Sequence, residues 1–271
     1  MSCSLRQLKI VIRGAGEMAT GTACRLHRAG FGSLLLLEIP SPLAVRRAVS
    51  FSEAVYEGTQ TVEGITAVRI SSVDEVDRVW ASSRIPVFVD PDKMAVTIVQ
   101  PHIVIDAILA KRNTGTAIDD APLVIGLGPG FFAGQDVKYV IETNRGHNLG
   151  KVISHGPPEP DTGAPGEIAG ESVRRVLRSP GDGVFLSDRA IGEPIEKGET
   201  VGEVAGLAVK AALDGVLRGL IRPGAHVFRN MKLGDVDPRA DRTHCFTISE
   251  KARAIGGGVL EAILMEFNRP N

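Results

Sequence analysis

A glycine-rich turn between a strand-like run and a helix-like segment constrains the fold of this chain more than any other feature. Residues 8–13 read LKIVIR, an apolar run typical of a buried strand, and residues 17–29 have the apolar spacing of a helix. Between them, Gly14, Gly16 and Ala19 complete the pattern G-x-G-x-x-A. A strand, a tight glycine turn and a helix in this order indicate the start of a parallel sheet with helices packed on it.

The same alternation of strand and helix patterns continues to about residue 110. Helix starts are predicted at Ser41-Pro42 and at a capping-box pattern that runs from Ser72 to Glu75. Short apolar runs predict further strands at 34–37, 86–90 and 102–107. We therefore predict an α/β protein whose residues 1–120 form a Rossmann-type nucleotide-binding domain with a parallel sheet.

Three further segments follow this domain. Residues 121–180 are predicted to form a mixed α/β segment with a glycine-rich loop, and residues 181–240 a small barrel-sandwich-like β unit. Residues 241–271 carry a helical pattern, interrupted by the glycines at 256–258, which we expect to pack back on the middle of the chain. Within the first of these segments, strand patterns cover 123–126, 136–143 and 151–155, and a helix pattern covers 167–178.

Each position of the glycine pattern has a role in the dinucleotide-binding fingerprint. Gly14 makes the tight turn, Gly16 lets backbone amides approach a pyrophosphate, and Ala19 lets the helix pack on the strand. The phosphate would lie at the helix N-terminus near Met18, where unpaired N–H groups and the helix dipole favour an anion. The alternative is a strand–turn–helix that binds no nucleotide, in which both glycines serve only the turn.

Two acidic residues bear on this interpretation. Glu38 ends the second predicted strand, at the distance where an acidic residue accepts a hydrogen bond from a ribose hydroxyl. Glu17 opens the predicted helix, and its charge would repel a diphosphate unless the side chain points away from the turn. Because Glu17 belongs to the turn itself, it is counted with the cofactor-binding positions.

Five other residues are candidates for a site. Gly128 and Gly130, in a glycine-rich loop after a predicted strand, offer a second place where the backbone can approach an anion. Asp106 ends a predicted strand, where open α/β sheets bind ligands. His147, in the polar turn NRGHNLG, is a candidate for proton transfer, and Cys245, which follows a histidine in a strand-like context, is a candidate nucleophile. The alternatives are ordinary solvated turns and a small buried thiol.

Charge and composition exclude several classes of function. The chain has 31 Lys and Arg against 32 Asp and Glu, and only 4% of its residues are aromatic, so we expect no nucleic-acid partner. The three cysteines show no paired spacing, and no apolar run has the length of a signal peptide or a membrane span. These patterns predict a cytoplasmic protein without a membrane partner, and no spacing indicates a metal site.

Six long stretches of this sequence carry distinctive motifs: VIRGAGEMATGTACRLHRAGF, RRAVSFSEAVYEG, DAILAKRNTGT, LVIGLGPGFFAGQDVKYVIETNRGHNLGKVI, DGVLRGLIRPGAHV and ISEKARAIGGGVLEAIL. With these motifs the sequence resembles the selenium-dependent molybdenum hydroxylase system proteins, which are bacterial accessory proteins. The resemblance runs over nearly the whole chain, from about residue 8 to residue 266.

The resemblance implies an accessory protein for the maturation of molybdenum hydroxylases. Its ligand would be NAD(P) or the nucleotide form of the molybdenum cofactor, between which the sequence does not distinguish. Its partner would be an apo-molybdenum hydroxylase, and assembly as a homo-oligomer is compatible with this role. Whether the chain is an enzyme stays open, because the alternatives are an NAD(P)-dependent oxidoreductase for a small substrate and a non-catalytic assembly scaffold.

Overall fold

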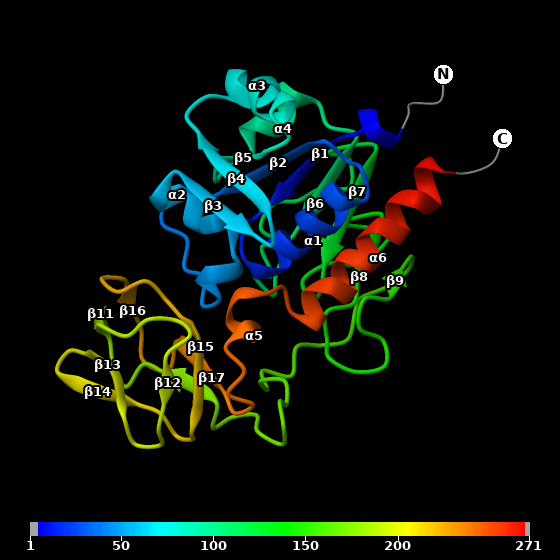
Figure 1. Cartoon of the computed structure of the whole chain (residues 1–271). Coiled ribbons are helices and arrows are strands. Elements are labelled where there is room, and N and C mark those ends of the chain that lie inside the picture. Colours follow the sequence, from blue (N-terminus) through cyan, green and yellow to red (C-terminus); the bar gives the residue numbers. More distant parts are fainter. Residues whose placement is uncertain (1–4, 269–271) are drawn as a thin grey trace. The chain divides into compact units, whose positions relative to one another are not determined.

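The computed structural model describes residues 5–268, and the chain divides into two compact units (Figure 1). The first unit comprises the residues up to 42 together with 50–161 and those from 248 onward, and the second comprises 43–49 and 162–247. These limits differ from the boundaries at 120, 180 and 240 expected from the sequence. The glycine-rich loop after residue 126 and the C-terminal helix both belong to the first unit.

Within the described residues, the first unit is built on one mixed sheet of nine strands. Their order is β3-β4-β5-β2-β1-β6-β7-β8-β9; the strands from β4 to β8 in this order are parallel, and the edge strands β3 and β9 are antiparallel to their neighbours. The prediction of an α/β protein is thus confirmed. The strands are β1 Lys9–Arg13, β2 Ser33–Glu38, β3 Thr59–Val62, β4 Ile65–Ile70, β5 Ile85–Val89, β6 Ile103–Asp106, β7 Leu123–Leu127, β8 Tyr139–Ile141 and β9 Val152–Ile153.

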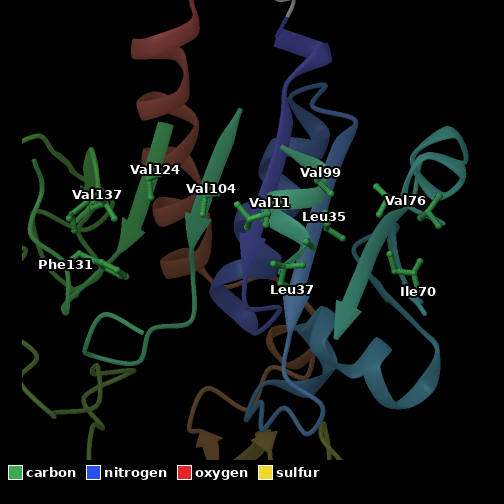
Figure 2. Close-up of a cluster of buried hydrophobic side chains, with 14 of the residues drawn as sticks. Val11, Leu35, Leu37, Ile70, Val76, Val99, Val104, Val124, Phe131 and Val137 are labelled. Atoms are coloured by element: carbon green, nitrogen blue, oxygen red, sulfur yellow. The ribbon is translucent and has the colours of Figure 1, made fainter. Parts of the chain in front are cut away.

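Helices cover both faces of this sheet. On one face, Val11, Leu35 and Val104 of the central strands form a hydrophobic core with residues of α3 and α4 (Figure 2). Side chains alternate along a strand, so the fully buried Ile10 and Ile12 point to the opposite face. There α1 contacts β1, α6 contacts β7 and β8, and the two helices pack against each other. The helices of this unit are α1 Glu17–Arg28, α2 Ala54–Glu57, α3 Val76–Ala81, α4 Met94–Val99 and α6 Glu250–Phe267.

The second unit, as far as the structure describes it, contains two antiparallel sheets of four strands, ordered β10-β17-β15-β12 and β14-β13-β11-β16. Residues of both sheets, among them Phe185, Leu217 and Leu233, share one hydrophobic core. The short helix α5 (Thr243–Phe246) belongs to the same unit. The strands are β10 Val176–Arg178, β11 Gly183–Leu186, β12 Pro194–Ile195, β13 Thr200–Val204, β14 Leu207–Lys210, β15 Gly215–Leu220, β16 His226–Val227 and β17 Lys232–Asp237.

The helix predicted at 167–178 is wrong. That segment forms an isolated β-bridge and then strand β10. Ala169 and Gly170 both have positive φ, at 49° and 79°, which ends any right-handed helix at this point. Farther on, the guanidinium of Arg175 is buried in an ion pair with Asp235 of β17, at 2.8 Å, which holds the segment against that strand.

The helix expected to start at Ser41-Pro42 is also absent. The local sequence does not prevent a helix here, because proline suits the first helical position and the N-cap residue before it is non-helical in any case. The following residues 43–49 join the second unit, where the Arg47 side chain donates to the carbonyl of Leu220 at 2.7 Å.

The glycines at 256–258 do not interrupt the last helix, because α6 continues through them to Phe267. A Cβ atom at Gly256 would lie 3.2 Å from the carbonyl oxygen of Gly21 in α1. The tertiary packing of α1 on α6 therefore favours a residue without a side chain, at the usual cost of a glycine inside a helix.

Candidate functional site

The carboxyl ends of the central strands meet at one edge of the large sheet, where the strand order reverses. From β1 the chain moves outward through β2 on one side, and later through β6 and β7 on the other. Arg13 at the end of β1 lies between Leu37 of β2 and Asp106 of β6. Open α/β sheets bind ligands outside the strand ends at such a reversal, so this edge is the candidate site.

Gly14 is required by the fold at this edge. Its φ is +94°, which L side chains rarely adopt, and its N–H donates to the carbonyl of Leu37 at 2.7 Å. A Cβ atom here would lie 3.2 Å from the carbonyl oxygen of Ala107, in the loop after β6. Both backbone conformation and close packing therefore explain this glycine.

Gly16 has no such structural requirement. Its φ is −67°, which any residue adopts, and a Cβ atom built on it meets nothing within 4 Å. It occupies the N-cap position of α1 without a capping hydrogen bond from a side chain. The Cβ position of Gly16 therefore faces open space, directly before the first amides of α1, and unpaired amides at a helix N-terminus favour an anion.

Buried side chains and hydrogen bonds hold the glycine turn in place. Ala19 is fully buried and Met18 nearly so, as expected for the face of α1 that packs on the sheet. The hydroxyl of Thr20 donates to the carbonyl of Ala15 at 3.1 Å, and that carbonyl also accepts from the backbone N–H of Ser52 at 2.8 Å. A turn fixed in this way presents its amides without reorganisation.

Glu38, at the end of β2, binds the glycine turn itself. One carboxylate oxygen accepts from the N–H of Ala15 at 2.8 Å and the other from the N–H of Ile39 at 2.9 Å. Burial raises the pKa of this carboxyl, and the two N–H donors oppose that rise. Each carboxylate oxygen keeps a second lone pair, so Glu38 can still accept from a ribose hydroxyl.

Asp106 is committed to a buried ion pair. It lies 3.0 Å from the guanidinium of Arg13, and the two side chains are 2% and 7% exposed. The same carboxylate accepts from the hydroxyl of Thr116 at 2.6 Å and from the N–H of Ile108 at 3.1 Å. Arg13 also donates to the carbonyl of Thr114 at 3.2 Å. The Asp106 carboxylate therefore holds the loop 107–116 over the strand ends and does not face a ligand.

Gly128 and Gly130 are explained by packing. Both have positive φ, and a Cβ atom at Gly128 would collide with the hydroxyl of Thr143. A Cβ atom at Gly130 would lie 2.6 Å from the backbone nitrogen of Arg112. The glycine loop after β7 thus lies against the same loop, 107–116, that Gly14 contacts, but the space beside its glycines is filled by protein.

Lys251, which the sequence analysis did not single out, belongs to a group of cations at this edge. Lys251, in the first turn of α6, is half-buried, and its pKa is lowered by burial first and then by Arg145 and Lys111. Lys111 lies 3.7 Å from Asp161, and Arg145 pairs with a carboxylate at the start of α6. Among the described residues, the ammonium group of Lys251 makes no hydrogen bond and no ion pair. An anion bound here would give this ammonium group a direct partner.

The position of Glu17 follows from the same group of cations. Its carboxylate and that of Asp161 act on Lys251 in the attractive sense, which opposes the lowering of the lysine pKa. The first turns of α1 and α6 lie close together, as the contact of Gly21 with Ala252 shows. The close approach of Gly21 to Ala252, where a Cβ atom on the glycine would be 2.7 Å from the alanine Cβ, shows how the two helices meet.

The two residues considered for catalysis are an exposed histidine and a buried cysteine. His147 is exposed in the loop between β8 and β9. Cys245 lies in the second unit, in α5 and not in a strand-like context, and its side chain is fully buried. Burial raises the pKa of this thiol, and the sulfur lies 3.9 Å from the carbonyl oxygen of Leu217. A buried, protonated thiol does not suit a nucleophile or a sulfur carrier.

Residues 5–268 contain no group of three or more His, Cys, Asp or Glu side chains arranged to hold a metal ion. In the same part of the chain, no helix has both the length and the apolar character needed to cross a membrane.

Comparison with known proteins gives a bacterial relative but no matching family model. The chain is 46% identical over 256 residues to "Uncharacterized protein YqeB" of Escherichia coli (strain K12), an alignment that covers 94% of this chain and 47% of that protein. The chain therefore spans about half the length of the curated relative that it matches.

Among solved structures, the chain is similar to E. coli tRNA N6-threonylcarbamoyladenosine dehydratase, TcdA, at 14% identity and a TM-score of 0.30, over 98% of this chain and 89% of that one. It is also similar to an aspartoacylase family protein from Mesorhizobium loti, at 12% identity and a TM-score of 0.28, over 84% of each chain. At these scores and identities, neither structure bears on what this chain does.

Proposed function

We propose that the chain binds the phosphate of a nucleotide-containing ligand at the carboxyl edge of its large sheet. The observation that carries this proposal is the open space at Gly16, since neither backbone angle nor packing requires glycine there. A glycine without a structural reason, directly in front of a helix N-terminus, is what a closely approaching phosphate needs. In this role the first unit is a Rossmann-type domain.

The residues at this edge fit such a ligand. The first amides of α1 would hold the phosphate, and Lys251 and Lys111 would compensate its charge. Glu38, which keeps free lone pairs beside the turn, would accept from the ribose. A nicotinamide dinucleotide would supply a hydride, whereas the nucleotide form of the molybdenum cofactor would be a cargo that the chain carries.

The proposed biological role rests on the resemblance of the sequence to the selenium-dependent molybdenum hydroxylase system proteins. In that role the chain is an accessory protein that presents its nucleotide-containing ligand to an apo-molybdenum hydroxylase during maturation. The rigid turn behind Gly16 suits binding and release of a cargo, because its amides need no rearrangement in either direction.

The binding claim is tested by thermal unfolding with NAD, NADP, ATP and CTP, each added separately. A ligand at about 100 times its dissociation constant contributes about 2.7 kcal/mol to stability and raises the Tm. We expect a raised Tm with at least one nucleotide for the wild type and for Gly32→Asp, and no shift for Gly16→Asp. Gly32 is a matched control, because it too has open space and an ordinary φ but lies in the loop between α1 and β2. Equal shifts in all three proteins would refute the site.

The role in maturation is tested in cells that lack the gene. We expect molybdenum hydroxylase activity to be low in such cells and to return with the wild-type chain or Gly32→Asp, but not with Gly16→Asp. Full restoration by Gly16→Asp would show that the nucleotide turn is not needed, and the chain would then act as a scaffold. Unchanged hydroxylase activity in the deleted strain would refute the role itself.

A further inference from the structure

A second cluster of cations lies on the first unit, away from the glycine turn. Arg25 and Arg28 lie in the C-terminal half of α1, two to three turns beyond Glu17, or about 12 Å or more along the helix. Together with Arg253 of α6 they line a pocket of about 380 Å³. This volume lies within the range of small-molecule sites in proteins.

The charges in this pocket are only partly compensated. Glu63, in the turn between β3 and β4, pairs with Arg28 at 2.9 Å and with Arg253 at 2.6 Å. Arg25 donates to the backbone carbonyl of Arg253 at 3.2 Å, and among the described residues no carboxylate pairs with it. Three guanidinium groups and one carboxylate give the pocket a net charge of about +2 at neutral pH.

Contacts with α6 and with Glu63 orient the arginines of this exposed pocket. A Cβ atom at Gly256 of α6 would lie 3.2 Å from the Cβ of Arg25, so the stem of Arg25 lies directly on the helix that carries Arg253. Arg28 is held by two bonds to Glu63, one to the carboxylate and one to the backbone carbonyl at 3.0 Å. Ile248 and Leu260 complete the lining with apolar surface.

We propose that this pocket binds a phosphate-bearing small molecule, at a site separate from the glycine turn. The planar guanidinium group matches the geometry of a phosphate with two parallel hydrogen bonds, and arginine is the preferred residue for such recognition. The two uncompensated positive charges match a phosphoryl group, which is a dianion. Ile248 and Leu260 provide contact for the uncharged part of the same molecule.

The test measures the binding of inorganic phosphate and pyrophosphate by titration calorimetry at constant ionic strength. The full chain with Gly16→Asp is used as the background, because it removes binding at the glycine turn. In this background we expect pyrophosphate to bind at one site, and Arg25→Gln to weaken it by about tenfold or more, as for the loss of a charge-assisted hydrogen bond. Arg25→Lys keeps the positive charge but not the planar guanidinium group. Its affinity for pyrophosphate should therefore lie between that of the Gly16→Asp background and that of Arg25→Gln.

Arg78→Gln is the matched control, because it removes one positive charge from a side chain that is 76% exposed on α3 of the same unit. It should leave pyrophosphate binding unchanged. Absence of binding in the Gly16→Asp background, or equal loss with Arg25→Gln and Arg78→Gln, would overturn the proposal. Because the glycine turn is already disabled, either result leaves the nucleotide proposal standing on its own experiment.

Discussion

Replacing Gly16 by aspartate should stabilise the chain while it abolishes ligand binding. Gly16 is the N-cap of α1, with φ −67° and ψ −174°, no capping bond from a side chain, and no atom within 4 Å of the place where a Cβ atom would lie. Replacing glycine at a compatible position stabilises by about 0.4–1 kcal/mol through the unfolded state. An Asp cap adds a few tenths of a kcal/mol over a Gly cap. The sum is about 1 kcal/mol, or about 2–4 °C in Tm.

Glu17 does not cancel this gain, because adjacent residues do not face each other on a helix. Binding should respond in the opposite direction. The new carboxylate would occupy the α1 amides and would repel the phosphate, so two charge-assisted hydrogen bonds are lost, each worth about 1.5–3 kcal/mol. Tenfold in affinity corresponds to about 1.4 kcal/mol, so we expect a loss of about a hundredfold or more, which removes nearly all of the stabilisation that the nucleotide gives in the thermal assay.

One pair of thermal scans measures both effects. Without ligand, Gly16→Asp should unfold at a higher temperature than the wild type; with a binding nucleotide, only the wild type should gain further stability. A lower Tm in the ligand-free scan would show that Gly16 has a structural role that the open space around it does not reveal. An undiminished shift with nucleotide would show that the phosphate binds elsewhere.

Three further substitutions have definite expected outcomes. Gly14→Ala should lower the free energy of unfolding by about 1–2 kcal/mol or more in urea titrations, because φ is +94° and the new Cβ atom would lie 3.2 Å from the Ala107 carbonyl oxygen. Asp106→Asn should cost about 3–5 kcal/mol in the same assay, because it leaves the Arg13 charge buried without a partner. The folded-state pKa of Lys251 is lowered from 10.5 by burial and by two neighbouring cations, so the folded chain binds this proton more weakly than the unfolded chain. Lys251 therefore destabilises the fold below its lowered pKa, and this effect fades as pH rises toward 10.5. Lys251→Met should accordingly be more stable than wild type at neutral pH, gain less stability in alkaline urea titrations, and bind nucleotide more weakly.

Local patterns in the sequence were sufficient for the strand–turn–helix at the start of the chain. The run at 8–13 became β1, the helix pattern at 17–29 became α1, and the capping box at Ser72 formed as expected. These elements are specified by neighbours in the sequence: apolar periodicity, a glycine with positive φ, and a side chain that caps its own helix. The helix predicted at 167–178 failed because the conformation of that segment depends on Asp235, which is distant in the sequence.

The candidate site was predictable only where it is local. Gly14, Gly16 and Glu38 meet because a turn and a neighbouring parallel strand bring them together, and the fingerprint encodes that arrangement. Lys251 reaches the same edge only because α6 crosses α1 at small residues, and no spacing in the sequence records such a crossing. Arg13 is a local signal of a buried ion pair, because a charged residue at the end of a buried strand needs a buried counter-charge.

The loop 107–116 connects the structural and the binding roles of this edge. Gly14 and Gly130 both pack against its backbone, Asp106 fastens it through Thr116, and it carries Lys111. Lys111 would compensate the charge of a ligand held by the α1 amides, and its position depends on the buried contacts of Asp106. Asp106→Asn should therefore weaken nucleotide binding even at temperatures where the chain stays folded, although Asp106 itself faces no ligand. Unchanged affinity in the folded variant would show that the loop is fastened independently of the site.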